Sequence, residues 1–128
     1  MRLVLLLMAA AAGPALAQAA DCSEAVTQAD LNECAYEGWQ AADRDLNDAY
    51  AAAVAKARDY DATSSTPAAE DTLREAQRAW VAYRDPACKA QAFPLTGGAA
   101  YPMEQFGCLQ RLTEQRTEML WLFARYPE

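Results

Sequence analysis

Histidine is absent from this chain of 128 residues. Histidine is the most common general base and metal ligand in proteins, so its absence excludes Ser–His and Cys–His nucleophile pairs. Acidic pairs such as Asp43 with Asp45 are left as candidates for glycosidase chemistry, but their spacing is typical of a solvated helix face. We therefore expect no enzymatic activity, no catalytic residue, no bound metal and no cofactor.

Long apolar runs are also scarce, and the only one lies near the N-terminus. Residues 3–12 are all apolar, but this run is too short to cross a bilayer as a helix. Arg2 precedes the run, and the small-residue cleavage pattern Ala15-Leu16-Ala17 follows it. The sequence therefore predicts a secretory signal peptide that is cleaved after Ala17, with cleavage after Ala19 as the near alternative.

With the signal peptide occupying residues 1–17, the mature protein is a single helical domain over residues 18–128. Cys22 follows Asp21 instead of a small residue at the cleavage point, so we expect no lipid attachment there. No second apolar run could hold the mature chain in a membrane. We expect a periplasmic or secreted protein without a membrane anchor.

Positive charge is in the minority. Beyond position 17 the chain has ten basic and eighteen acidic residues, a net charge of −8. Such a surface repels nucleic acid and is steered towards basic partners, although acidity that only keeps an exported protein soluble is the more common explanation. The charge therefore excludes a nucleic-acid partner and is compatible with a basic protein partner.

Close cysteine pairs of the Cys-x-x-Cys kind are missing, which argues against a zinc site. The chain has four cysteines, Cys22, Cys34, Cys88 and Cys108. In an oxidising compartment an even number of cysteines indicates a disulfide framework. We expect two disulfides.

Apolar residues recur at steps of three and four, which is helical spacing, and no segment alternates as a strand would. The spacing predicts helices over about 28–58, over about 67–84 and from Tyr101 until Pro127 stops the last one. The polar stretch 59–66 is expected to be a linker, and 93–98 a turn region that is not helical. Thr66-Pro67 is expected to cap the second helix and Pro86 to end or kink it.

This order of elements predicts an all-α fold, an antiparallel up-down-up bundle of three helices. In that topology all four cysteines lie at one end, so both disulfides hold the same end of the bundle. Three pairings are possible. We favour Cys22–Cys34 with Cys88–Cys108, because each closes a short segment, and Cys22–Cys88 with Cys34–Cys108 is nearly as favourable.

Polar residues occupy several positions that the helical spacing turns inward. They are expected to form a buried or half-buried hydrogen-bond network that fixes the helix register, with a ligand pocket as the less favoured alternative. The members are Asp43, Asn47, Gln77, Arg84, Thr113 and Arg116.

Aromatic residues divide into a core group and a loop group. Trp39, Tyr50, Trp80 and Tyr83 lie on the apolar stripes and are expected in the core. The loop group holds the candidates for contact with a partner, because binding residues are often found in loops between rigid elements. Its members are Phe93, Gly97, Gly98 and Tyr101.

Several of these residues belong to longer motifs. The motifs are the run 43–50 (DRDLNDAY), the run 76–85 (AQRAWVAYRD) followed by Cys88, Gly97-Gly98, and Cys108 followed by Leu112-Thr113 and Arg116. Their order and spacing resemble the LprI-type lysozyme-inhibitor domain over nearly the whole mature chain. Pro86 departs from the family pattern, where a helix former is usual, and the namesake is a lipoprotein, which this chain is not expected to be.

The resemblance implies a helical, disulfide-bonded bacterial protein of the periplasm or exterior. It also implies a binding protein that inhibits lysozyme or a similar cell-wall hydrolase, since the namesake is described as a lysozyme inhibitor. A basic lysozyme-like hydrolase would then be the partner. The alternative is a structural or stress-related envelope protein that binds another periplasmic partner.

Overall fold

The computed structural model describes residues 21–127, and the predicted signal peptide lies outside them. Within these residues the chain forms helix α1 (Gln28–Thr63), helix α2 (Ala69–Ala92), a short 3-10 turn η1 (Phe93–Leu95) and helix α3 (Tyr101–Ala124). This described part contains no strand. The predicted all-α fold of three helices is confirmed.

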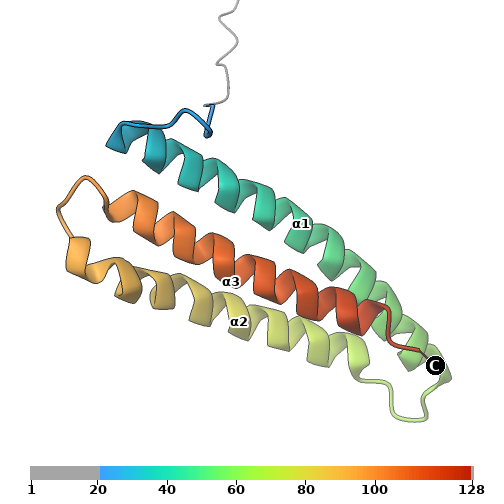
Figure 1. The fold of residues 1–128 in the computed structure, drawn as a ribbon. Coiled ribbons are helices and arrows are strands. Elements are labelled where there is room, and N and C mark those ends of the chain that lie inside the picture. Colours follow the sequence, from blue (N-terminus) through green and yellow to red (C-terminus); the bar gives the residue numbers. More distant parts are fainter. Residues whose placement is uncertain (1–20, 128) are drawn as a thin grey trace, which may run out of the picture.

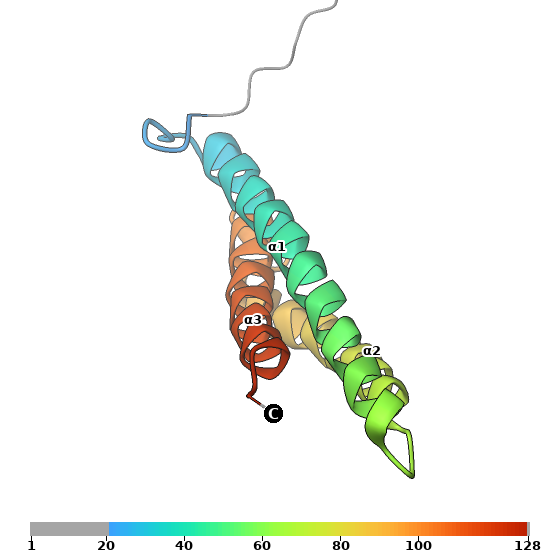
Figure 2. The same cartoon turned by 90° about the vertical axis from the view of Figure 1, so that its right-hand side faces the viewer.

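The three helices run alternately in opposite directions (Figure 1), and each packs against the other two. Helix α3 packs most extensively against α1. The view turned by 90° shows the C-terminal end of α3 standing apart from the adjoining ends of α1 and α2 (Figure 2). We call this end of the bundle, where α3 stands apart from α1 and α2, the splayed end.

Helix α1 begins with a capping box. The Thr27 hydroxyl accepts the Asp30 N–H, and the Asp30 carboxylate accepts the Thr27 N–H. The helix continues to Thr63, so the predicted end near residue 58 was wrong. Residues 59–63 include no glycine or proline, the residues that oppose a helix most strongly, and bonds from the start of α2 to the Asp61 carboxylate hold this last turn in place.

Helix α2 begins at Ala69, and its N-cap residue, Ala68, has no side chain that could cap the helix. The predicted cap at Thr66-Pro67 was therefore wrong. The last turn of α1 supplies the cap instead: the Asp61 carboxylate accepts the N–H groups of Ala68, Ala69 and Glu70 at 2.8, 2.7 and 3.0 Å. A single carboxylate thus satisfies three unpaired donors and joins two helices.

Helix α2 passes through Pro86 and ends only at Ala92, so Pro86 does not end the helix, which was one of the two effects predicted for it. Proline removes one helical hydrogen bond, the one that the carbonyl of Ala82 would accept. Ala82 and Pro86 are both exposed, so water can bind that carbonyl. The turn region 93–98 was predicted to be non-helical, yet Phe93–Leu95 form a 3-10 turn, in which Pro94 is tolerated near the start.

The core consists of two clusters along the bundle. One contains Leu46, Ala49, Ala53 and Leu120, with Tyr50 and Trp80 packed against it, and the other contains Cys88, Cys108 and Leu109, with Trp39 packed against it. Three of the four predicted core aromatics are thus placed against the core. Tyr83 is not, because its side chain is 62% exposed. The inward positions of α2 are Trp80, Arg84 and Cys88, and Tyr83 is turned about 100° from Arg84 around the helix.

The disulfides are Cys22–Cys34 and Cys88–Cys108, which confirms the favoured pairing. Both lie at the end of the bundle where α1 and α3 begin and α2 ends (Figure 1). The two bridges differ in their surroundings. Cys88 and Cys108 are 0% and 3% exposed and form part of the core, whereas Cys22 is exposed.

Candidate functional site

A polar layer crosses the middle of the bundle around Arg84, which is 7% exposed. Its Nε donates to Asp85 at 2.8 Å, and its Nη1 donates to Asp43 of α1 at 3.4 Å and to Thr113 of α3 at 3.3 Å. The guanidinium also lies over the Trp80 ring, 5.0 Å from its centroid. Arg84 therefore connects all three helices through charged and polar partners.

A second part of the layer joins α3 to α2. The Nε of Arg116 donates to the side-chain carbonyl of Gln77 at 3.0 Å. Both residues are half-buried, and burial lowers the pKa of the Arg116 guanidinium. The structure thus brings five of the six predicted network residues into two groups, one around Arg84 and one around Arg116.

Asn47 takes no place in either group, and the prediction that it faces inward was wrong. Its side chain is exposed. The buried stripe of α1 runs through Ala42, Leu46, Ala49 and Ala53, and Asn47 lies one position beyond Leu46, a rotation of about 100°. The apolar spacing alone does not determine whether the positions beside this stripe are buried or exposed.

Around Arg84 the polar layer offers no reactive group that its neighbours leave unengaged. Arg84 has a partner on every helix, and Asp43 and Asp85 each accept from it. Among residues 21–127 no group of three or more cysteine and acidic residues is placed to hold a metal ion. The arrangement is suited to fixing the positions of the helices relative to one another.

The predicted contact loop lies at the disulfide end. Phe93 is 72% exposed in η1, and Gly97 has a φ of +81°, a conformation that favours glycine. Tyr101 is half-buried at the start of α3, and the Asn32 amide of α1 donates to the Ala99 carbonyl at 2.9 Å, which ties the loop to α1.

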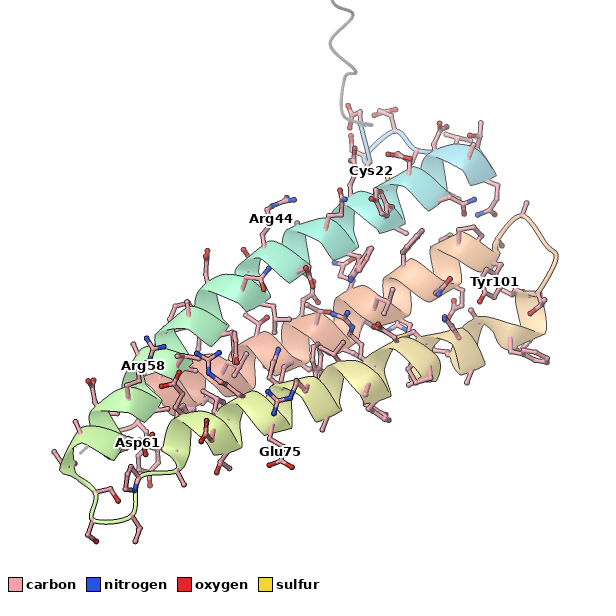
Figure 3. The ribbon with its side chains drawn as sticks, turned by 180° about the vertical axis from the view of Figure 1, so that it is seen from behind. Cys22, Arg44, Arg58, Asp61, Glu75 and Tyr101 are labelled. Atoms are coloured by element: carbon pink, nitrogen blue, oxygen red, sulfur yellow. A yellow bond between two sulfur atoms is a disulfide. The ribbon has the colours of Figure 1, made fainter. Side chains whose placement is uncertain are left out.

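The loop of residues 64–68, which contains the end of the predicted linker, joins α1 to α2 at the opposite end of the bundle. Figure 3 shows this separation, with Tyr101 at one end and Asp61 at the other. A small contact could therefore use one of these loops but not both.

The negative charge is concentrated in one part of the chain, which the total charge alone does not reveal. Residues 21–63, which contain α1, hold ten acidic and three basic residues, a net charge of −7 out of the −8 beyond position 17. Helix α2 has four acidic and four basic residues and is neutral. A separate count for each predicted helix would have revealed this asymmetry in the sequence.

Apart from Asp43 and Asp61, which contact α2, the acidic residues of α1 line the side opposite its buried stripe, and we call this side the acidic face. Figure 3 shows Arg44, which lies on it, pointing away from the other two helices. The basic residue Arg58 is engaged elsewhere, because it pairs with Glu70 of α2 at 2.9 Å. The acidic face comprises Asp30, Glu33, Glu37, Asp45, Asp48 and Asp59, of which all but Glu37 are exposed.

Glu70 is the centre of an ion-pair group at the splayed end. Its carboxylate accepts from Arg58 of α1 at 2.9 and 3.0 Å and from Arg74 within α2. Hydrogen bonds from Arg58 and then Arg74 lower the pKa of Glu70 to about 2. Together with the Asp61 cap, this group fixes the connection between α1 and α2.

Comparison with known proteins places this architecture in context. A crystal structure of a DUF1311 family protein from Pseudomonas putida KT2440 superposes with a TM-score of 0.68 at 24% sequence identity, over 81% of this chain and 98% of that one. An uncharacterized protein of Rhizobium meliloti (strain 1021) is 43% identical over 105 residues, which are 78% of this chain and 76% of the relative. The first likeness supports the fold, and the second extends over most of both sequences.

The two disulfides are compatible with an extracytoplasmic location. Among residues 21–127 no helix is long and apolar enough to cross a membrane. The sequence model of the family described as "Lysozyme inhibitor LprI" matches residues 19–120. This match covers most of the chain, including both disulfides, the polar layer and most of α3. The chain therefore belongs to the LprI lysozyme inhibitor family.

Proposed function

We propose that this protein is an exported bacterial binding protein without enzymatic activity, which inhibits a basic lysozyme or a similar cell-wall hydrolase. The membership of the chain in an inhibitor family supports this proposal. The observation that carries it for this chain is the acidic face of α1. A basic enzyme would approach this face first, because opposite charge raises the local concentration of the partner and the rate of association.

The distribution of charge supports α1 as the contact surface better than it supports the other helices. Residues 21–63 carry −7, whereas α2 is neutral and α3 carries −1. Asp45 and Asp48 lie near the middle of α1 and are exposed. Neither accepts a hydrogen bond from the other helices in the described part of the chain, so both carboxylates are available to a partner.

The stability of the surface also supports the proposal. Helix α1 is fixed at its first turns by the Cys22–Cys34 bridge, in its middle by Asp43 with Arg84, and near its end by Arg58 with Glu70. A surface that is ordered before binding loses less conformational entropy when the partner associates.

The test is inhibition of bacterial cell-wall lysis by a purified basic lysozyme, with wild type compared to two double variants. Asp45→Lys with Asp48→Lys reverses charge on the acidic face. Glu75→Lys with Glu118→Lys makes the same total change of charge at exposed positions of α2 and α3. We expect the first pair to weaken inhibition at low salt about 10-fold or more, mainly through slower association, and the control pair to have a much smaller effect.

Equal effects of the two double variants would show that only net charge matters and would remove α1 as the contact surface. The loop with Phe93, Gly97, Gly98 and Tyr101 is a second proposed contact. Phe93→Ala tests it, because this exposed aromatic side chain is not part of the core. If wild type inhibits no lysozyme at all, the structural or stress-related envelope role with another periplasmic partner takes its place.

A further inference from the structure

A cleft of about 620 Å³ opens at the splayed end of the bundle, between the end of α1, the start of α2 and the second half of α3. It lies where Figure 2 shows the end of α3 standing apart from the other two helices. The volume is within the range of about 300–1,000 Å³ that is typical of small-molecule sites. Of the polar layer only Arg116 lines this cleft, and no residue of the acidic face of α1 does.

The walls of the cleft are mainly apolar. Tyr60, Leu73, Met119, Leu120 and Phe123 contribute large side chains from all three helices. Met119 is 58% exposed although it lies beside these residues, so a large apolar group remains in contact with solvent. An apolar ligand would remove this surface from water, at about 25 cal/mol for each Å² covered.

Among the described residues, Arg116 is the only basic one that lines the cleft. Of its five N–H donors, the one on Nε is donated to Gln77, an uncharged partner. No carboxylate of the described residues lies within ion-pair distance of its guanidinium, although the side chain is half-buried. A half-buried cation with unused donors is complementary to an anionic group with oxygen acceptors.

The acidic group of the cleft is already engaged. Asp61 lines the cleft, but its carboxylate accepts three backbone N–H groups at the start of α2. The nearby Glu70 is paired with Arg58 and Arg74. Arg116 is therefore the charged side chain of the cleft whose interactions are incomplete.

We propose that the cleft binds a free long-chain carboxylate, with the apolar chain against Leu73, Leu120 and Phe123 and the carboxylate accepting from Arg116. The apolar walls account for the chain and the unused Arg116 donors account for the headgroup. The acidic surface of the protein disfavours anionic membranes, which supports a free ligand over a lipid in a bilayer. This site is independent of the proposed inhibition by α1.

Methionine signals provide a direct test. The chain beyond position 17 contains two methionines, Met103 near the disulfide end and Met119 in the cleft. We would label the methionine methyl groups with carbon-13 in the exported protein and titrate dodecanoate below its micelle concentration. The expected result is a saturable shift of the Met119 signal with little change at Met103. No shift at Met119, or equal shifts at both, would overturn the proposal.

The headgroup is tested with dodecanol, which has the same chain without the charge. We expect dodecanoate to bind at least about 10-fold more tightly, and Arg116→Met to remove this difference. Arg111→Met is the matched control, because Arg111 is exposed on the same helix outside the cleft, and it should leave the difference unchanged. A dodecanoate preference that persists in Arg116→Met would refute the role of Arg116.

Arg116→Met removes the bond to Gln77 and could unfold the protein, so a second variant fills the cleft instead. Thr72 is exposed and lines the cleft. Thr72→Trp should abolish the Met119 shift while leaving the fold intact by circular dichroism, and an undiminished shift in this folded variant contradicts the site. Co-sedimentation with anionic phospholipid vesicles completes the test, because binding to vesicles without binding to free dodecanoate would also contradict it.

Discussion

Removal of the Cys88–Cys108 bridge should destabilise the protein more than removal of Cys22–Cys34. The bridges separate their cysteines by 20 and 12 residues. Loop-closure entropy in the unfolded chain assigns each of them about 3 kcal/mol, with a difference of only about 0.4 kcal/mol between them. Chain entropy alone therefore predicts nearly equal effects.

Burial separates the two bridges. Cys88 and Cys108 are 0% and 3% exposed and pack with Leu109, so their replacement by alanine leaves cavities in the core. Each cavity of about one methyl group costs about 1 kcal/mol. We expect about 5 kcal/mol of lost stability for Cys88→Ala with Cys108→Ala, against about 3 kcal/mol for the replacement of the other pair, which includes the exposed Cys22.

Urea unfolding of the exported protein, followed by far-UV circular dichroism, measures both losses. The variants should unfold at lower urea concentrations, and the core pair should have the lower midpoint. Equal midpoints, or a larger loss for the pair with Cys22, would refute the reasoning from burial. Complete unfolding of the core pair agrees with the prediction, since a loss of about 5 kcal/mol approaches the total stability of a small domain.

Three further predictions concern the core, the polar layer and pH. Leu120→Ala should cost about 3 kcal/mol in urea unfolding and Leu122→Ala less than about 0.5 kcal/mol, because Leu120 is 1% exposed and Leu122 is 71% exposed; equal losses would contradict the packing. Arg84→Met should cost about 1–3 kcal/mol by leaving the buried Thr113 hydroxyl without its donor. Adding Thr113→Val to this variant should restore part of the loss. A loss in the double variant equal to the sum of the two single losses would argue against the coupling of these residues. The pKa of Glu70 is lowered from 4.5 to about 2, so the contribution of its ion pairs to folding stability is complete above pH 4.5 and is lost as the pH falls towards 2. Glu70→Gln should therefore make the free energy of unfolding less dependent on pH between these values. An unchanged pH dependence would contradict the ion-pair group.

The sequence predicts the fold well because apolar spacing determines which side of each helix is buried. Leu46 and Trp80 lie on the stripes as expected, and the cysteine order limits the pairing to one end. The errors lie at positions beside a stripe or at a helix end. Asn47 and Tyr83 are each about 100° from a buried neighbour, and spacing alone does not determine how wide the buried side is.

Features that depend on contacts between helices were beyond the sequence patterns. The cap of α2 comes from Asp61 of α1, eight residues before Ala69, so a search for a cap next to the helix start could not find it. The cleft around Arg116 arises from the divergence of α3, which no local pattern encodes. The acidic face, in contrast, needs only the predicted helix boundaries and a count of charges.

We expect the acidic face of α1 to direct binding to a basic cell-wall hydrolase. The most direct measurement is the association rate of the wild-type exported protein with immobilised basic lysozyme between about 0.02 and 0.5 M salt. We expect binding that accompanies inhibition and an association rate that falls steeply with salt, while the dissociation rate changes little. An association rate independent of salt, or no binding at low salt, would contradict this expectation.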